Sequence, residues 1–331
     1  MIRTEVIIVG GGPAGSACAW RLKQNNIDCL VLDQHRFPRF KPCAGWINPH
    51  VLEDLAFDPA DYPYGLTTFD ALRMSIHGVR FTLRTRQHAI RRFEFDNWLL
   101  KRSGAPVEMH TVKTITREKD GYLVDGEYFG KYLIGAGGTY CPVYRTFFKS
   151  DNPKHRDALI AAQEEEFPYE HTDTDCLLWF FENQLPGYAW YIPKANGYVN
   201  VGVGGKAEGL HSTGRSLKDH WNDLVEKLDR LGLVRNHDYQ PSAHTYYLRQ
   251  RLPEIRKENA FLTGDAAGLA TLDMGEGISP AIKSGLMAAD AIAHGARYAI
   301  DAIPRYSLFP GPLLESIFWP LLRKPSRVPD L

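Results

Sequence analysis

The order of apolar and polar positions divides the chain into two kinds of segment. Residues 5–9 form a β-branched run with little polar interruption, as expected for a strand covered on both faces. Residues 28–33 repeat this pattern and end on an acidic residue, and a small-residue segment over 16–22 predicts a helix between them. Strands that alternate with helices in this way are typical of a parallel α/β domain.

The middle of the chain follows a different pattern. Between residues 155 and 250, a helical period is strong only near 217–233. Elsewhere the apolar positions alternate with polar ones, which predicts antiparallel strands over 176–181, 189–192 and 197–203, joined by turns at 186–187 and 195–197.

The segment between the first strand and the first helix reads GxGxxG. Gly10 permits a tight turn, Gly12 lets a pyrophosphate approach the backbone, and Gly15 lets helix and strand pack closely. The helix N-terminus offers free N–H groups to phosphates, and Asp33 is placed to accept hydrogen bonds from a ribose. The alternative is a glycine-rich turn in an unrelated α/β domain. The candidate residues of this dinucleotide site are Gly10, Gly12, Pro13, Ala14, Gly15 and Asp33.

A second glycine-rich motif near the other end of the chain distinguishes FAD from NAD. Residues 259–268 read as a strand that runs into a Gly-Asp pair, and a small-residue helix follows the glycines near 276. A cofactor held by both ends of the chain should be long, which favours FAD, with its ribityl chain on Asp265 and its isoalloxazine near the start of that helix. The candidates are Gly264, Asp265, Gly275, Gly277 and Ile278.

The helix predicted over residues 92–100 begins with Arg92. An arginine in this place is suited to hold a phosphate or the middle of the flavin. An ordinary surface arginine is the alternative.

Composition excludes several classes of protein. The chain has 331 residues with 39 Lys+Arg and 39 Asp+Glu, so the formal net charge is zero and we expect no nucleic-acid partner. No run of about 18 apolar residues predicts a membrane span, and the opening residues do not resemble a signal peptide. The five cysteines include no CxxC pair, so we expect no disulfide framework, no metal site and a cytoplasmic location.

Six motifs in this order resemble the flavoprotein family with the p-hydroxybenzoate hydroxylase fold and, within it, the geranylgeranyl reductase group. They are GxGxxG at 10–15, KPCAG at 41–45, RFEFD at 92–96, GAGG at 135–138, YAWYIP at 188–193 and GDAAG…GEGI at 264–278. The first and last are common to the superfamily, whereas KPCAG and YAWYIP point to the reductase group. The resemblance covers residues 1 to about 295.

This resemblance implies a mixed α/β fold in which a Rossmann-like FAD-binding domain interleaves with an antiparallel-sheet substrate domain. It implies an FAD-dependent oxidoreductase that transfers hydride from flavin N5 to an isolated carbon–carbon double bond of an isoprenoid-type or other hydrophobic substrate. It also implies that Cys43 and Ala44 border the isoalloxazine. We place the FAD-binding domain at 1–70, 90–150 and 250–300, the sheet domain at 71–89 and 151–249, and a short tail at 301–331.

The role of Cys43 stays open between a working thiol, a disulfide with Cys141 and plain filler. Arg39 and Lys41 are close in sequence, so we expect a lowered pKa for the Cys43 thiol at the reactive face. Alkene reduction needs a proton as well as a hydride, and this thiol or Tyr188 could donate it.

Tyr188 and Trp190 belong to an aromatic-rich sheet that either forms a core or roofs the substrate pocket. With Cys43 they are the candidate catalytic residues. We interpret Glu164–Glu166 as a solvated strand edge rather than a catalytic carboxylate pair. Three histidines without ligand spacing are assigned structural roles: His88, His171 and His244.

Two other functions fit the same motifs. The main alternative is an FAD-dependent monooxygenase, a hydroxylase or halogenase acting on an aromatic or hydrophobic substrate, because YAWYIP lacks only the first Trp of the halogenase Trp-x-Trp-x-Ile-Pro. A flavoprotein without a working pocket, serving as a scaffold or electron relay, is the other.

The segment 201–205 resembles a nucleotide loop but no helix start follows it, so we interpret it as a strand that passes another group closely. Without a second dinucleotide fold, we expect transient NAD(P)H or another external electron donor. The apolar segment 312–324 ends in basic residues and is expected to dock on the body or to lie on a membrane surface, which a lipid substrate would favour.

Overall fold

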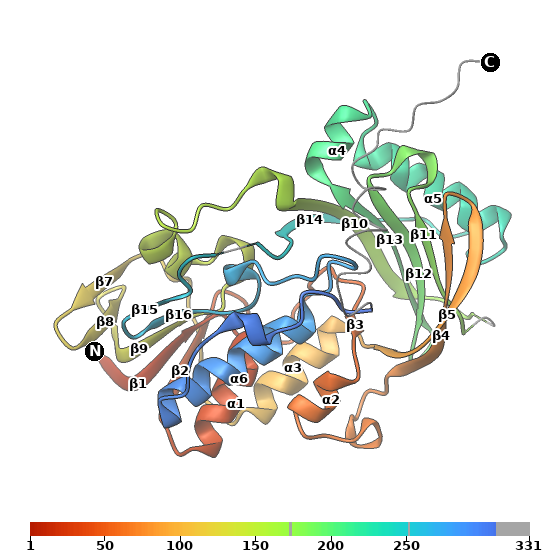
Figure 1. Ribbon diagram of the computed structural model, residues 1–331. Helices are drawn as coiled ribbons and strands as arrows, with labels where there is room; N and C mark the ends of the chain where they lie inside the picture. Colours follow the sequence, from red (N-terminus) through yellow and green to blue (C-terminus); the bar gives the residue numbers. More distant parts are fainter. Residues whose placement is uncertain (172–173, 251, 309–331) are drawn as a thin grey trace.

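Two eight-stranded sheets organise the chain, one mainly parallel and the other mainly antiparallel (Figure 1). The structure is a computed structural model, and it describes residues 1–171, 174–250 and 252–308. The two sheets lie side by side as separate halves, and the chain passes between them several times. The mixed α/β fold with a Rossmann-like half and an antiparallel sheet is therefore confirmed.

The parallel sheet has the strand order β15-β16-β9-β1-β2-β6, and the β7–β8 hairpin pairs with β9. Strands β16, β9, β1, β2 and β6 run parallel, whereas β15 is antiparallel to β16. The strands are β1 (Ile2–Val9), β2 (Cys29–Asp33), β6 (Val107–Met109), β7 (Ile115–Glu118), β8 (Gly121–Val124), β9 (Tyr128–Gly135), β15 (Arg256–Lys257) and β16 (Ala260–Leu262).

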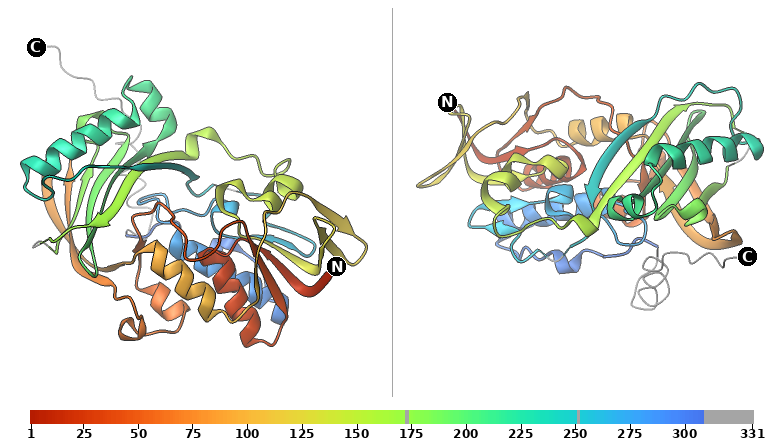
Figure 2. Two further views of the ribbon diagram at one scale, coloured as in Figure 1. Left: turned by 180° about the vertical axis from the view of Figure 1, so that it is seen from behind. Right: turned by 90° about the horizontal axis from the view of Figure 1, so that it is seen from above.

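Helices α1 (Pro13–Gln24), α3 (Arg92–Arg102) and α6 (Ile278–His294) lie together beside this sheet, with the short α2 (His50–Asp54) next to them (Figures 1 and 2). Helices α1 and α6 approach very closely, because a Cβ on Gly285 would lie 2.1 Å from the Ala14 carbonyl oxygen. Two segments from opposite ends of the sequence are thus packed backbone to backbone, which the small residues of both helices permit.

The antiparallel sheet has the order β14-β10-β13-β12-β11-β4-β5-β3, in which only β11 and β4 pair in parallel. The strands predicted over 176–181, 189–192 and 197–203 are confirmed as β11, β12 and β13. All eight strands are β3 (Trp46–Ile47), β4 (Thr67–Ile76), β5 (Val79–Ala89), β10 (Leu159–Pro168), β11 (Cys176–Phe180), β12 (Gly187–Lys194), β13 (Tyr198–Lys206) and β14 (Ser242–Tyr247).

The two faces of the antiparallel sheet have different neighbours. Helices α4 (Ala207–Ser212) and α5 (Leu217–Arg230) cover its outer face (Figure 2). There, Trp221 and Leu224 of α5 pack on β-branched residues of β13. The inner face, defined by Glu164, Trp190 and Gly202 in one cross-strand row, is turned toward the parallel-sheet half. Because side chains alternate along a strand, register alone decides which residues of β10, β12 and β13 reach the inner face.

Among the described residues, no helix combines the length and hydropathy that crossing a bilayer requires. The segment 312–324, for which we expected docking or a membrane contact, lies outside the described residues. The domain boundaries given above stay a prediction.

Candidate active site

The turn between β1 and α1 is built on glycines that the surrounding backbone requires. Gly10 has a φ of +111°, and a Cβ there would lie 2.4 Å from the Ala136 carbonyl oxygen. A Cβ on Gly15 would lie only 1.9 Å from the Gly10 carbonyl oxygen. A Cβ on Gly12, in contrast, would meet only the Arg39 Nη2 atom at 3.4 Å. Gly10 and Gly15 therefore hold the turn together, whereas Gly12 leaves room for a ligand.

Polar groups around this turn fit a nucleotide diphosphate. Asp33 ends β2, and its carboxylate accepts a hydrogen bond from the Gly11 amide at 2.7 Å. The Arg39 guanidinium lies 3.3 Å from the Asp96 carboxylate through Nη2, while its buried Nη1 has no hydrogen-bond partner among the described residues. Helix α1 starts at Gly12 without a side-chain cap. An unpartnered guanidinium nitrogen beside an uncapped helix N-terminus fits the pyrophosphate of FAD.

Arg92 is not the surface residue that we kept as an alternative. Its side chain is buried and donates two hydrogen bonds to Asp96, at 2.6 and 2.7 Å. Asp96 thereby forms ion pairs with both Arg92 and Arg39 and joins α3 to the turn after β2. The arrangement orients the two guanidinium groups toward the same region, and Arg39 is a phosphate candidate that we had considered only as a neighbour of Cys43.

The second glycine motif meets the first in space. A Cβ on Gly264 would lie 3.3 Å from the Cβ of Ala14, in the first turn of α1. Gly277 is the uncapped N-terminal residue of α6, and its Cβ would lie 3.2 Å from the Asp265 carboxylate. The two ends of the chain therefore form one cradle, as expected for a long cofactor.

Lys154 is a further member of this cradle that the sequence did not indicate. Its Nζ atom donates to the Asp265 backbone oxygen at 3.1 Å, and burial lowers the pKa of the amine to about 8. No motif surrounds Lys154, so only the folded chain brings it to Asp265.

The loop of residues 41–45, called the KPC loop below, lies between the two halves. The Gly45 amide donates a hydrogen bond to the Cys43 sulfur at 3.4 Å. Burial raises the pKa of the Cys43 thiol, and the nearby Arg92 charge only partly opposes this. Our expectation of a lowered pKa is therefore wrong, because desolvation outweighs the positive charges. The disulfide is not formed, since Cys43 and Cys141 are both free thiols.

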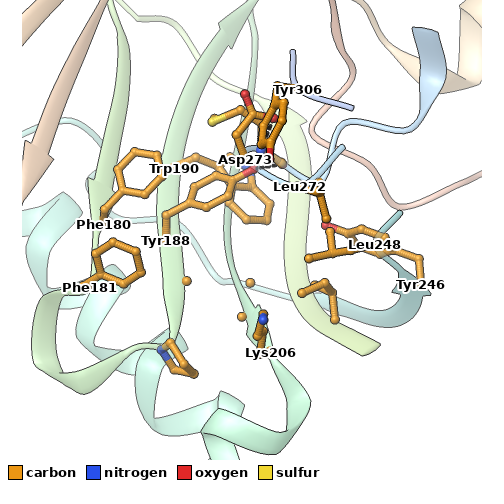
Figure 3. A pocket seen from close by; sticks show the side chains of 17 residues that line it. Phe180, Phe181, Tyr188, Trp190, Lys206, Tyr246, Leu248, Leu272, Asp273 and Tyr306 are labelled. Atoms are coloured by element: carbon orange, nitrogen blue, oxygen red, sulfur yellow. Dashed lines mark hydrogen bonds between the residues drawn. The ribbon is translucent and has the colours of Figure 1, made fainter. Parts of the chain in front are cut away.

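An apolar pocket opens on the inner face of the antiparallel sheet (Figure 3). Phe180, Tyr188 and Trp190 from β11 and β12 form one wall, and Tyr246 of β14 faces them. The remaining wall comes from residues 272–275, immediately before α6. The pocket thus connects the inner face of the antiparallel sheet to the segment that starts the second cofactor motif.

Two hydrogen bonds fix the aromatic wall of the pocket. The Tyr188 hydroxyl donates to the Met274 backbone oxygen at 2.6 Å, and burial raises the pKa of Tyr188 well above its usual value. The Trp190 indole nitrogen donates to Asn200 Oδ1 at 2.7 Å. A Cβ on Gly202 would lie 2.2 Å from the indole ring, so the expected close passage at 201–205 is confirmed.

Proteins of several organisms align with most of this chain. Residues 8–73 match the family model of the NAD(P)-binding Rossmann-like domain. The chain is 32% identical to an uncharacterised protein of Methanosarcina barkeri, over 91% of this chain and 77% of that protein. It is 31% identical to digeranylgeranylglycerophospholipid reductase 3 of Methanosphaera stadtmanae, over 86% of this chain and 76% of that protein.

The chain belongs to the geranylgeranyl reductase family of FAD-dependent oxidoreductases. A more distant relative of this reductase, the menaquinone reductase of Mycolicibacterium smegmatis, is 27% identical over 88% of this chain and 77% of that protein.

Solved structures share the fold of the reductase. A geranylgeranyl bacteriochlorophyll reductase-like protein of Thermoplasma acidophilum matches with a TM-score of 0.77 and 21% identity, over 98% of this chain and 84% of that chain. The flavin-dependent halogenase CmlS matches with a TM-score of 0.72 and 21% identity, over 89% of this chain and 60% of that chain. At such identities, fold alone does not distinguish a reductase from a halogenase.

The structure contradicts our interpretation of Glu164–Glu166 as a solvated edge. Strand β10 is central, because it pairs with β13 on one side and β14 on the other. Glu164 is only 2% exposed, and Glu166 accepts hydrogen bonds from Lys194 at 2.8 Å and Arg91 at 2.9 Å. Although burial raises the pKa of Glu166, these two cations lower it overall. Three consecutive glutamates hide the alternation of buried and exposed positions along β10. The sequence pattern therefore suggested a solvated edge where the structure has a buried strand.

His244 is a second residue of the inner face that we had assigned a structural role. Register places it on β14 beside β10, where its Nδ1 lies 3.7 Å from a Glu164 carboxyl oxygen. Its ring stacks on Tyr246 with a centroid distance of 5.8 Å. Burial lowers the pKa of His244 to about 4, so the imidazole is neutral at pH 7.

Proposed function

We propose that this reductase saturates carbon–carbon double bonds of an isoprenoid-type lipid. The observation that carries the proposal is the apolar pocket walled by Tyr188, Trp190 and Tyr246, which opens next to the start of α6. Aromatic and aliphatic side chains make up most of the pocket lining, which suits a hydrocarbon chain, and a double bond in that chain would lie beside the cofactor cradle. The names of the relatives support the same substrate class.

For the cofactor, we propose that FAD lies along the cradle formed by the two glycine motifs. Its pyrophosphate would lie at Gly12, Pro13 and Ala14, near Arg39, and its adenosine ribose near Asp33. The proposed contacts of the remaining parts are Gly10, Gly15, Cys43, Ala44, Arg92, Gly264, Asp265, Gly275, Gly277 and Ile278. When bound and reduced, FAD supplies the hydride.

The protein's own contribution is to exclude water and to orient the lipid. The Tyr188–Met274 hydrogen bond ties the sheet to residues 272–275, which fixes the width of the pocket. The Trp190 indole packs closely on the backbone at Gly202 and contributes an apolar surface to the pocket. Both residues act as positioning residues in this proposal, and neither needs to exchange a proton.

The electron donor is external in this proposal. Among the described residues, the Rossmann-like fold occurs once, in the half that holds the two glycine motifs. We propose that NAD(P)H visits briefly or that another donor reduces the flavin.

Anaerobic reoxidation tests the proposed reaction. Purified protein would be reduced photochemically and mixed under nitrogen with a geranylgeranyl lipid or with a prenyl quinone. We expect the oxidised flavin spectrum to return with a lipid product two hydrogen atoms heavier per saturated bond. A parallel sample mixed with air tests the monooxygenase alternative. Inertness toward both prenyl compounds, with a hydroperoxide-type absorbance in air, would replace the reductase by a monooxygenase.

A further inference from the structure

Glu164 is the buried acid of the inner face that the proposed function does not yet use. Neither of its carboxyl oxygens makes a hydrogen bond of good geometry among the described residues, although Asn200 lies close by. A buried carboxyl group without such bonds costs free energy, and native chains avoid it unless the group has a task. Glu164 shares a cross-strand row with Trp190, which lines the pocket, and this position suggests that task.

The Glu164 side chain lies near Cys43 of the KPC loop and in the same cross-strand row as Trp190, which lines the pocket. In the cross-strand row, Glu164 of β10 faces Gly202 of β13, which faces Trp190 of β12. A Cβ on Gly202 would touch both the Trp190 ring, at 2.2 Å, and the Glu164 Cβ, at 2.7 Å. Glu164 therefore lies directly behind the indole that walls the pocket, and its charge would act on the Cys43 thiol of the KPC loop.

The groups around Glu164 come from every element packed against it. These groups are cations, one carboxylate and several neutral titratable side chains. They are Lys41 and Cys43 of the KPC loop, Arg92 of α3, Lys194 of β12, Glu166 of β10, and His244 and Tyr246 of β14. Burial raises the pKa of Glu164 to about 8 even though Lys194 opposes the shift. The carboxyl group is therefore mostly protonated at pH 7, while a carboxylate formed there would have cations nearby.

We propose that Glu164 is the general acid of the reductase, giving its proton to the alkene carbon that does not receive the hydride. The inference rests on the proposed function, because it needs an alkene as proton acceptor. The carboxyl O–H bond breaks, a C–H bond forms on the substrate, and the electron pair of the double bond becomes the C–H bond. The hydride from reduced FAD forms the second C–H bond, so atoms and electrons balance. The carboxylate regains a proton from solvent on the side of His244, which is 19% exposed.

This assignment differs from the two donors that the sequence suggested. The Tyr188 hydroxyl is committed to the Met274 oxygen. The Cys43 thiol accepts from Gly45 and lies beside Arg92. Glu164 combines a proton held at neutral pH with two oxygens that are not engaged in hydrogen bonds of good geometry among the described residues.

The experiment compares Glu164→Gln with Glu165→Gln. Glu165 is the next residue of β10 but lies on the opposite face, where it accepts from Gln240 at 2.6 Å and contacts His237 at 2.9 Å. The control thus removes a carboxyl group from the same strand without touching the pocket. Single-turnover reduction of a geranylgeranyl lipid would be measured anaerobically on flavin-loaded protein, and Glu164→Asp would be measured in the same way.

We expect Glu164→Gln to slow the single turnover by roughly 100-fold or more, with normal FAD content, since general acids contribute about 10²–10⁴-fold. Glu164→Asp should regain part of that rate, whereas Glu165→Gln should lose less than about tenfold. Wild-type-like turnover of Glu164→Gln, or a loss of the same size in Glu165→Gln, would overturn the assignment.

A substrate-free readout separates this inference from the proposed function. Infrared difference spectra of the purified protein between pH 6 and pH 10 should show a buried carboxylic-acid band that is absent in Glu164→Gln and present in Glu165→Gln. Burial also raises the pKa of Glu276 to about 7, so a second band, unchanged in both variants, should accompany it. Absence of the Glu164-dependent band in the wild type would overturn the assignment of Glu164 as a general acid, whatever the substrate is. If the band is present but wild type reduces neither prenyl compound, the proposed function fails, and the assignment of Glu164 as proton donor to an alkene falls with it.

Discussion

The two sheets hold their parts of the site by different means. In the parallel half, backbone makes the site: Gly10 and Gly15 are required by clashes of 2.4 and 1.9 Å that any side chain would create. In the antiparallel half, side chains make the site, and Glu164, Trp190 and His244 come from three different strands. A motif can encode the first arrangement locally, whereas only register across strands creates the second.

Breaking the backbone site should have the largest effect. Gly15→Val places a side chain against the Gly10 carbonyl oxygen, and we expect loss of nearly all bound FAD together with a loss of folded protein. The flavin-to-protein absorbance ratio and far-ultraviolet circular dichroism measure the two losses.

Gly12→Ala is the matched control, because its Cβ would meet only the movable Arg39 side chain at 3.4 Å. The folded fraction should stay at the wild-type level while FAD affinity falls. Unchanged FAD affinity in Gly12→Ala would argue against a pyrophosphate at this turn.

The side-chain half is most sensitive to pH through Glu164. Its pKa lies near 4.5 in the unfolded chain and is raised by burial to about 8 in the folded one. Between about pH 4.5 and pH 8, folding of the wild type therefore takes up a proton at Glu164. The contribution of this carboxyl group to stability is complete at low pH and is lost as the pH rises toward 8. The glutamine side chain of the Glu164→Gln variant cannot ionise. The unfolding free energy of this variant minus that of the wild type should therefore increase by on the order of 4 kcal/mol from pH 5 to pH 9.

Thermal or denaturant unfolding at each pH measures this difference, and the comparison needs no substrate. A difference that stays constant with pH would show that the Glu164 carboxyl group is ionised in the folded protein at neutral pH.

Gly202→Ala tests whether close packing behind the pocket matters as much as the glycine turn. The new Cβ would displace the Trp190 ring and press on Glu164, so we expect a loss of about 1–3 kcal/mol and much slower lipid reduction, with FAD still bound. Denaturant unfolding and single-turnover kinetics provide the measurements.

Gly204→Ala, two residues along the same strand, is the control for this change. Its Cβ would meet Ala162 at 3.4 Å and the Trp190 ring at 3.5 Å, which are ordinary contacts. A stability loss in Gly204→Ala as large as that in Gly202→Ala would contradict the packing argument.

The smallest expected effect comes from Tyr188→Phe, which removes the hydrogen bond to the Met274 oxygen. We expect a loss of about 1 kcal/mol in unfolding free energy. The KM for the lipid should rise with little change in kcat, because Tyr188 positions the aromatic wall of the pocket. Tyr140→Phe removes an exposed hydroxyl contact to Thr245 at 3.1 Å and should be neutral. A large fall in kcat with an unchanged KM would indicate that Tyr188 donates the proton.

The sequence revealed the parallel half better than the antiparallel half, for a physical reason. The strand, glycine turn, helix and acid of residues 5–33 are contiguous, so their spacing predicts both the fold and the ligand class. The strands β11, β12 and β13 were also predictable from alternation. The burial of Glu164 was not predictable, because three consecutive glutamates mask the alternation along the strand. The strands that pair with β10, and their register, depend on residues far away in the sequence.

Electrostatics was the other part that the sequence could not supply. Lys41 and Arg39 near Cys43 suggested a lowered pKa for the thiol, but burial reverses the sign of that shift. Lys154 and Arg39 reached the cofactor cradle through tertiary contacts that no motif marks. Charge counts along a chain say little about pKa until burial is known.

The most direct test of the account is the mass of a geranylgeranyl lipid after one anaerobic turnover with reduced wild-type protein and with Gly202→Ala. We predict a product two hydrogen atoms heavier per saturated bond with the wild type, and almost none in the same time with Gly202→Ala despite equal FAD content. A wild-type protein that leaves the lipid mass unchanged, or a Gly202→Ala protein that reduces it equally fast, would contradict an alkene-reduction site on the inner face of the antiparallel sheet.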